Sequence, residues 1–287
     1  MSVERKIGVI GLGLMGTAIS LRLLEHGYSV RVWNRTQEEA APLVERGAVW
    51  SDAVATECDR VVICLYSSDI VAMVVGPLLP DLRAGQVFVD TTTGEPAQSE
   101  AMGAQLAARG VSYLAAPISG SSEQTRRGEA TVIVGGGREA FEGCADLWPV
   151  LGRNVFHVGG WGDAARMKLA SNLVLGLNRA ALAEGLAFAE AIGLEPAAAL
   201  EVLKGSMAYS RAMDVKGRKM IERDFSVQAR LSQHLKDVRL MLDAAADAGL
   251  SLPLSETHRR LMERAEAEGW GDLDNSAIID VYRSSSP

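Results

Sequence analysis

Short apolar runs alternate with amphipathic stretches through the first half of this 287-residue chain. The runs KIGVIG, SVRVW, RVVICL, QVFVD, VSYLAAP, ATVIVGG and NVFHVGG are rich in valine or other apolar residues, and glycine or polar residues bound several of them, as is typical of buried strands. Stretches such as TAISLRLLEHG between them place apolar residues at helical spacing. This alternation predicts an α/β domain in which helices cover both faces of a mainly parallel sheet.

The pattern changes after Gly162, because no further β-branched run appears. Long helical patterns follow, separated by GLEP, GLSLP and GWGDLD, where glycine, in two cases followed by proline, is expected to end a helix. We therefore expect a sheet domain over residues 1–162 and an all-helical domain over residues 163–287. The helix expected over Leu169–Leu194 has more apolar positions than one small helical domain should need to cover. This excess predicts a homodimer or homotetramer built on the helical domain.

The charge narrows the classes of partner. Lys and Arg number 29 against 36 Asp and Glu, a formal charge of −7, which argues against a nucleic-acid-binding protein.

The apolar helix expected over Leu169–Leu194 contains Asn172, Arg179 and Glu190, which are costly in lipid, so no membrane span is expected. The N-terminus has no secretory pattern, and we expect a cytoplasmic protein. The histidines and cysteines lack metal-ligand spacing, and no metal site is expected.

A glycine motif follows the first predicted strand. Gly11, Gly13 and Gly16 form GxGxxG, with a helix expected after it and a second strand ending about 20 residues later, a context that favours dinucleotide binding. The backbone of the turn, from Gly11 through Leu12, Gly13, Leu14 and Met15 to Gly16, would approach a pyrophosphate at the start of the helix. This arrangement predicts a Rossmann-type domain.

The second strand ends on Asn34, Arg35 and Thr36, where an acidic residue usually binds the ribose 2′-hydroxyl. Asn34 is neutral and able to donate, Arg35 suits phosphate oxygens, and Thr36 begins the next predicted helix. These residues predict NADP(H) in preference to NAD(H). The alternative is that Arg35 is an ordinary solvated surface charge.

Lys168 and Asn172 lie four residues apart in an apolar helical stretch and therefore share one helix face. Desolvation lowers the pKa of a lysine amine, which makes it a candidate proton donor or acceptor near neutral pH. The alternative is that Lys168 extends to solvent and Asn172 caps a neighbouring turn. The loop ISGSS offers Ser119, Gly120 and Ser121 to a substrate carboxylate, although the same residues also suit an ordinary polar turn. The adjacent pair Lys236 and Asp237 is expected to be a solvated surface pair.

The chain resembles the β-hydroxyacid dehydrogenase family, which includes the 3-hydroxyisobutyrate dehydrogenases. Four motifs carry the resemblance in the family's order: IGVIGLGLMG, DTTTGEP, PISGSSEQTRRGEATVIVGG, and GDAARMKLASNL with the later KDVRLML. The resemblance implies that Lys168 is the catalytic lysine and that Asn172, Ser119 and Gly120 hold substrate. It also implies cofactor contacts from Leu65, Tyr66, Thr93 and Lys236. The chain departs from the family pattern in SGSS, which replaces Ser-Gly-Gly, and in Ser171, which replaces an asparagine of some relatives.

These observations predict an NADP-dependent oxidoreductase that interconverts a small hydroxy acid and its semialdehyde, with Lys168 as general acid and base. The Asn-Arg-Thr end of the second strand resembles the glyoxylate/succinic semialdehyde reductase branch. An imine reductase is the alternative enzyme, although such proteins typically lack the lysine. A non-catalytic NADP-binding scaffold is the alternative from another class.

Overall fold

The computed structural model describes residues 5–284. The chain divides into two compact units, Met1–Lys168 and Leu169–Pro287. The long helix α9, Trp161–Ala191, contains both this division and the boundary expected near Gly162.

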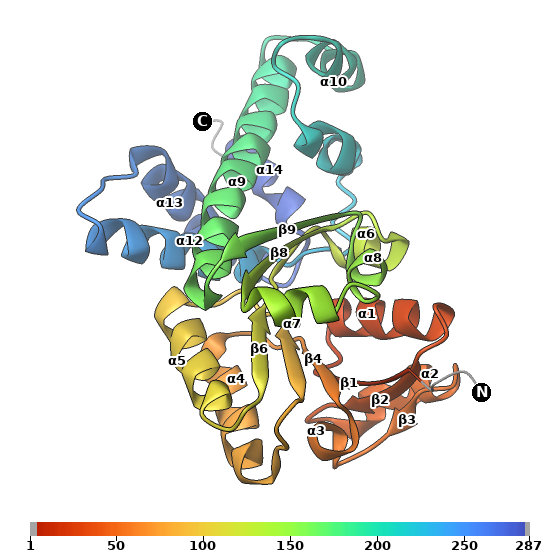
Figure 1. Cartoon of the computed structure of the whole chain (residues 1–287). Coiled ribbons are helices and arrows are strands. Elements are labelled where there is room, and N and C mark those ends of the chain that lie inside the picture. The colour runs from red at the N-terminus through yellow and green to blue at the C-terminus, as the bar shows by residue number, and fades with distance from the viewer. Residues whose placement is uncertain (1–4, 285–287) are drawn as a thin grey trace. The chain divides into compact units, whose positions relative to one another are not determined.

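The first unit contains a nine-stranded sheet in the order β3-β2-β1-β4-β5-β6-β8-β7, with β9 paired to β8 (Figure 1). The neighbouring strands from β3 through β6 pair in parallel, whereas β8 is antiparallel to β6 and β7. The strands are β1 Lys6–Ile10, β2 Ser29–Trp33, β3 Val49–Trp50, β4 Arg60–Ile63, β5 Val87–Asp90, β6 Ser112–Ala115, β7 Ile118–Ser119, β8 Thr131–Gly136 and β9 Asn154–Gly159. The predicted mainly parallel sheet is confirmed.

Alternate side chains of the central strands point to opposite faces and enter separate apolar cores. Val62 and Val89 lie in one core, whereas Val61 and Phe88 lie in the other. The helices of this unit are α1 Leu14–Glu25, α2 Ala41–Val44, α3 Val54–Glu57, α4 Ser68–Val75, α5 Pro96–Ala107, α6 Ser122–Arg127, α7 Arg138–Gly143 and α8 Trp148–Leu151, with 3-10 turns η1 Gln37–Ala40 and η2 Gly76–Asp81. Because both faces of the strands are covered, the parallel strands read as continuous apolar runs.

The helix expected to begin at Thr36 is divided into η1 and the single turn α2. Pro42 stands at the start of α2, where its missing N–H group is tolerated. A proline inside a longer helix would instead remove a backbone hydrogen bond, so the division is what the residue requires.

The second unit is helical, and no β-strand is found among its described residues. After α9 come α10 Pro196–Gly205, the π-helical turn η3 Met213–Gly217, α11 Arg218–Glu222, α12 Leu231–Asp247, α13 Pro253–Ala267, η4 Asn275–Ile278 and α14 Ile279–Arg283. Gly193, Gly249 and Gly269 adopt positive φ angles just after α9, α12 and α13, as the sequence predicts for helix ends. Over residues 5–284, no helix has the length and apolar character needed to span a bilayer.

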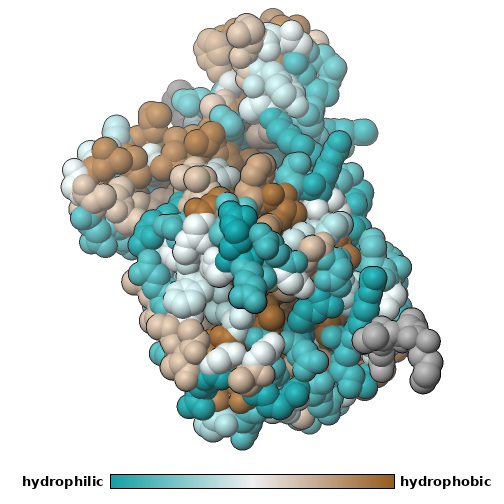
Figure 2. Space-filling view, in the orientation of Figure 1, coloured by the Kyte–Doolittle hydropathy of each residue, from teal (hydrophilic) through white to brown (hydrophobic). Residues whose placement is uncertain are grey.

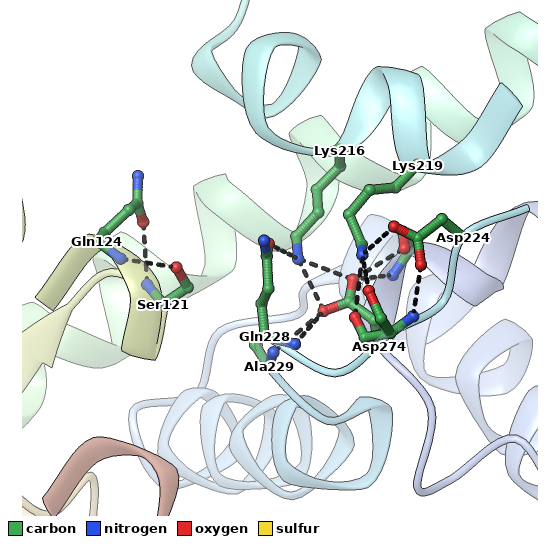
Figure 3. A network of polar contacts seen from close by, with 10 residues as sticks. Ser121, Gln124, Lys216, Lys219, Asp224, Gln228, Ala229 and Asp274 are labelled. Atoms are coloured by element: carbon green, nitrogen blue, oxygen red, sulfur yellow. Dashed lines mark hydrogen bonds and ion pairs between the residues drawn. The ribbon is translucent and has the colours of Figure 1, made fainter. Parts of the chain in front are cut away.

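A buried ionic network fixes the loops of the helical unit (Figure 3). The Lys216 ammonium lies 2.7 and 2.9 Å from the two carboxylate oxygens of Asp274, which is fully buried. Backbone N–H groups of Gln228 and Ala229 and both donors of Ser276 also bond to this carboxylate. Removing one partner of such a pair costs about 3–5 kcal/mol, so the network determines how the segment before α12 packs on the segment before η4.

Candidate functional site

A side chain would meet different surroundings at each of the three glycines of the GxGxxG turn. Gly11 has a φ of +96°, and a Cβ there would collide with the carbonyl oxygen of Cys64. A Cβ on Gly16 would collide with the carbonyl oxygen of Gly11. No described atom lies within 4 Å of the position a Cβ would take on Gly13, whose φ of −65° suits any residue. The protein therefore requires two of the glycines for its own packing, and leaves open space above the third.

The helix α1 begins directly at this open space. Its N-cap is Gly13, which provides no side-chain cap, and its first turn contains no acidic residue. Gly13 and Leu14 are exposed, Met15 is half-buried, and Leu12 is buried. Unpaired N–H groups and the helix dipole favour an anion at this position. The turn from Gly11 to Gly16 thus fits the pyrophosphate of a dinucleotide, and the space above Gly13 is where the close approach would occur.

Asn34 uses its side-chain amide to hold the turn together. Its Oδ1 accepts a hydrogen bond of 3.0 Å from the backbone N–H of Leu12. Its Nδ2 donates to the carbonyl of Thr36 at 3.0 Å and to the carboxylate of Glu39 at 2.9 Å. Both ends of the amide are therefore engaged within the protein, and the donor that the sequence indicated at Asn34 bonds to Thr36 and Glu39.

Arg35 and Thr36 are exposed beside this amide. Arg35 has no hydrogen bond or ion pair with any residue in the described range 5–284. The guanidinium is therefore available to a phosphate, whereas the Thr36 carbonyl already accepts from Asn34. Thr36 forms the N-cap of η1 without a side-chain cap bond, which leaves its hydroxyl free of that role.

Hydrogen bonds join the loops after β4 and β5. The backbone N–H of Leu65 donates to the Thr92 hydroxyl at 3.1 Å, and the N–H of Thr92 donates to Asp90 at 2.9 Å. Tyr66 is exposed and Thr93 is half-buried. The carboxyl ends of neighbouring parallel strands meet at one edge of the sheet, so these loops lie at the same edge as the glycine turn.

Ser119 ends β7, and Gly120 and Ser121 follow it at the start of α6. The Ser121 hydroxyl accepts from the N–H of Gln124 at 3.2 Å, and the Gln124 side chain accepts from the N–H of Ser121 at 2.9 Å (Figure 3). This reciprocal capping box engages the Ser121 side chain. Ser119 and Gly120 are half-buried.

Lys168 and Asn172 lie one turn apart on α9, and both are buried, with 5% and 6% of their surfaces exposed. The alternative in which Lys168 extends into solvent does not hold in this structure. The Asn172 side chain donates to the carboxylate of Asp237 on α12 at 2.9 Å, rather than capping a neighbouring turn.

Asp237 is a residue whose role the sequence reasoning misjudged. The pair Lys236–Asp237 was expected to be solvated, but Asp237 is only 5% exposed, and its carboxylate lies 3.3 Å from the Lys236 ammonium. The missed signal is helical spacing. Positions 231, 234, 235, 238 and 241 of α12 are buried, and residue 237 lies on the same side. A carboxylate on a buried helix face requires partners, and Asn172 and Lys236 are among those of Asp237.

Two family models match nearly the whole described chain. The NAD binding domain of 6-phosphogluconate dehydrogenase matches residues 6–159. The NAD-binding domain of NADP-dependent 3-hydroxyisobutyrate dehydrogenase matches residues 162–282.

The chain belongs to the β-hydroxyacid dehydrogenase family. The family resemblance and the enzyme class expected from the sequence, a dehydrogenase or reductase of the 3-hydroxyisobutyrate dehydrogenase type, are thereby confirmed. The chain also has this family's NAD(P)-binding domain.

Several known proteins of similar length resemble this β-hydroxyacid dehydrogenase. The 2-(hydroxymethyl)glutarate dehydrogenase of Eubacterium barkeri is 32% identical over 98% of this chain and 96% of its own. The 2-hydroxy-3-oxopropionate reductase of Escherichia coli is 32% identical over 96% of each. The solved structure of Psf3 in complex with NADP+ and 2-OPP superposes with a TM-score of 0.88 at 29% identity, covering 96% of this chain and 99% of that one.

A search of the described residues for three or more histidine, cysteine, aspartate or glutamate side chains able to hold one metal ion finds no such group.

Proposed function

We propose that the protein is an NADP-dependent oxidoreductase that interconverts a small carboxylate-bearing hydroxy acid and its semialdehyde or oxo acid. The observation that carries this proposal is the buried pair Lys168 and Asn172 on one face of α9. A buried ammonium beside a fixed amide suits a reaction in which negative charge develops on one substrate oxygen.

When bound, the nicotinamide cofactor would supply or accept the hydride at the substrate carbon. The residues suited to hold it are the turn Gly11–Gly16, the loops carrying Leu65, Tyr66 and Thr93, and Lys236. Support comes from the open space over Gly13 and the uncapped start of α1.

We propose Lys168 as the general acid and base. In the reductive direction its ammonium would give a proton to the oxygen that was the carbonyl oxygen, and in reverse its amine would take the hydroxyl proton. Asn172 would orient that oxygen, and the bond from Asn172 to Asp237 restricts the amide to one orientation. Pre-organised donors of this kind need no rearrangement as the charge forms.

Ser119 and the backbone N–H groups near Gly120 would bind the substrate carboxylate. The names of two relatives, 2-(hydroxymethyl)glutarate dehydrogenase and 2-hydroxy-3-oxopropionate reductase, both denote compounds with a carboxylate close to the reacting group. We assign Ser121 a smaller part, because its hydroxyl already accepts from Gln124. It would shape the site through its backbone.

The preference for NADP(H) over NAD(H) is assigned to Arg35 and Thr36. The Arg35 guanidinium is exposed and lacks an ion pair within residues 5–284, so a 2′-phosphate would be its partner. Asn34 would act indirectly, by holding the turn and the Thr36 carbonyl in place. The solved relative in complex with NADP+ supports this assignment.

We further propose a homodimer or homotetramer in which a second copy covers the apolar surface of the helical unit. Figure 2 shows hydrophobic side chains gathered over parts of this unit. The exposed large apolar residues of α9, α10 and the loops beside them include Val174, Leu175, Phe188, Ile192, Leu194, Val202 and Met207. A patch of this kind is unusual on a monomer. A monomeric mass by light scattering at micromolar concentration would contradict this assembly.

The replacement Lys168→Ala tests the catalytic proposal. Turnover should fall by about three orders of magnitude or more, because one group supplies both the proton and the charge stabilisation. NADPH binding should persist, and the exposed neighbour Met167→Ala should retain activity as the matched control. Near-normal turnover of Lys168→Ala would remove the lysine from the mechanism.

The substrate is identified by NADPH oxidation with glyoxylate, succinic semialdehyde, tartronate semialdehyde and methylmalonate semialdehyde, and by the matching hydroxy acids in reverse. Cyclic imines in the same assay test the alternative reductase. Turnover of imines alone would favour that alternative, and tight cofactor binding without turnover of any compound would favour a scaffold.

A further inference from the structure

A pocket of about 270 Å³ lies in the first unit between α4 and α5, which are neighbours in Figure 1. None of the residues proposed above for cofactor or substrate binding lines it. Its apolar walls are Val71, Ala72, Ala101 and Met102, and its polar groups include Asp90 and Tyr113. The size suits a molecule smaller than most drug-sized ligands.

A buried carboxyl group, that of Asp90, is among the groups that line this pocket. Asp90 Oδ2 accepts a hydrogen bond of 2.8 Å from the Tyr113 hydroxyl, and Oδ1 accepts one of 2.9 Å from the N–H of Thr92. Burial raises the pKa of Asp90, and the hydrogen bonds only partly offset this effect. A carboxylate can accept about four hydrogen bonds, and the bonds from Tyr113 and from the backbone and side chain of Thr92 do not use all of this capacity.

The pocket has no basic side chain among its lining residues, all of which belong to the described range. Asp69 adds a second carboxylate at the rim, where it accepts from Gln98 at 3.0 Å, so the fixed charges are all negative. A buried carboxyl group that is not matched by a cation is uncommon, since proteins usually pair or neutralise such groups. A cationic ligand would satisfy it, whereas an anion would be repelled.

We propose that this pocket binds a small primary ammonium ion that carries a short apolar chain. The ammonium head donates to the free lone pairs of Asp90, and the chain packs against Val71, Ala72 and Met102. A charged hydrogen bond at a partly desolvated carboxylate and the burial of a few methylene groups act together.

The site is coupled to the loops at the edge of the sheet, and this part rests on the proposed cofactor binding. Asp90 accepts from the N–H of Thr92, whose hydroxyl accepts from the N–H of Leu65. An ammonium ion that bonds to the Asp90 carboxylate holds it in the position from which it accepts from the N–H of Thr92. Occupancy therefore stabilises the loops that contain Leu65 and Thr93 and tightens cofactor binding, and by reciprocity the cofactor tightens ammonium binding.

The experiment is a ¹H–¹⁵N chemical-shift titration of the full chain, without cofactor, using n-butylammonium chloride. Saturable shifts are expected for the amides of α4 and α5, together with a shift of the Thr92 amide that bonds to Asp90. The neutral isostere n-butanol should bind at least tenfold more weakly at these amides, and butyrate should leave them unchanged. The absence of saturable shifts in α4 and α5, or equal shifts with butyrate, would overturn the proposal.

Two variants at exposed positions of α5 locate the binding. Ala101→Leu fills the pocket and should weaken n-butylammonium binding at least tenfold, whereas Ala104→Leu, which does not line the pocket, should leave it unchanged. Asp90→Asn should remove the preference for the ammonium over butanol. Equal binding by the wild type and Ala101→Leu would place the ligand elsewhere and refute the site. Because this titration needs neither cofactor nor turnover, its result tests the ammonium site independently of the proposed activity.

Discussion

The side-chain amide of Asn172 donates to the carboxylate of Asp237 at 2.9 Å, and both residues are almost completely buried. The two residues are 65 positions apart and lie on α9 and α12. The same carboxylate is 3.3 Å from the ammonium of Lys236. A single buried acid thus holds two residues that the family resemblance connects with substrate and cofactor.

The replacement Asp237→Asn keeps the size of the side chain and removes its charge. We expect kcat to fall about tenfold to a hundredfold, because a misplaced orienting group costs this much without removing the acid–base residue. Steady-state kinetics should show a larger effect on kcat than on KM, which a merely structural role would not produce. Asp243→Asn, on an exposed position of α12, should have wild-type kinetics. Equal values for both variants would remove Asp237 from any positioning role.

Alanine substitutions at Gly13 and Gly16 should distinguish an effect on cofactor binding from an effect on folding stability. Gly13→Ala should destabilise the fold by less than about 1 kcal/mol, since its Cβ meets open space and only an N-cap preference is lost, but it should weaken NADPH binding at least tenfold. Gly16→Ala should destabilise the fold by about 1–3 kcal/mol, because its Cβ collides with the Gly11 carbonyl. Unfolding without cofactor and fluorescence titration with NADPH measure the two effects. Unchanged NADPH affinity in Gly13→Ala would contradict a pyrophosphate above this residue.

The exposed Arg35 guanidinium should determine the preference for NADPH over NADH. Arg35→Ala should weaken NADPH binding by about tenfold, the value expected for one charge-assisted hydrogen bond, and should not change NADH binding. The effect should diminish as salt is added, because the contact is solvent-exposed. Arg46→Ala, another exposed arginine of the same unit, is the control. An equal loss of affinity for both cofactors would mean that Arg35 does not read the 2′-phosphate.

His258 should make stability depend on pH. Burial, and next the charge of Arg179, lower the pKa of His258 from 6.5 to about 3. Its ring lies 5.4 Å from that of His234, and within the described residues neither Nε nor Nη2 of Arg179 has a hydrogen-bond partner. Below pH 6.5 the unfolded chain binds a proton that folded His258 does not, so stability falls as pH falls towards 3.

The cost from this one group is about 1.4 kcal/mol per pH unit. His258→Gln should remove this contribution from the slope of unfolding free energy against pH between roughly 6 and 4.5. Urea unfolding at several pH values measures it. Identical slopes for the wild type and the variant would show that His258 is protonated in the folded protein.

The sequence indicated the glycine turn and the helical lysine because both follow from local rules. A strand followed by GxGxxG and a helix leaves few other structures, and the spacing of Lys168 and Asn172 places them on one face of any helix that contains them. Asn34 shows the limit of this reasoning. The sequence shows that its side chain is neutral, but its bond to Leu12 connects positions 22 residues apart and depends on the way β1 and β2 pair.

The amino-acid sequence by itself determined the α/β unit with its helical extension, the family and the enzyme class, since periodicity and motif spacing act over short stretches of chain. Only the tertiary structure decided that Asp237 is buried against Asn172, that Gly13 is the one of the three turn glycines whose Cβ would meet open space, and that Asp90 lines a pocket. Each of these facts depends on which distant elements pack together. A buried polar residue loses its hydrogen bonds to water and therefore needs a partner within the protein or a ligand, whereas an exposed one does not.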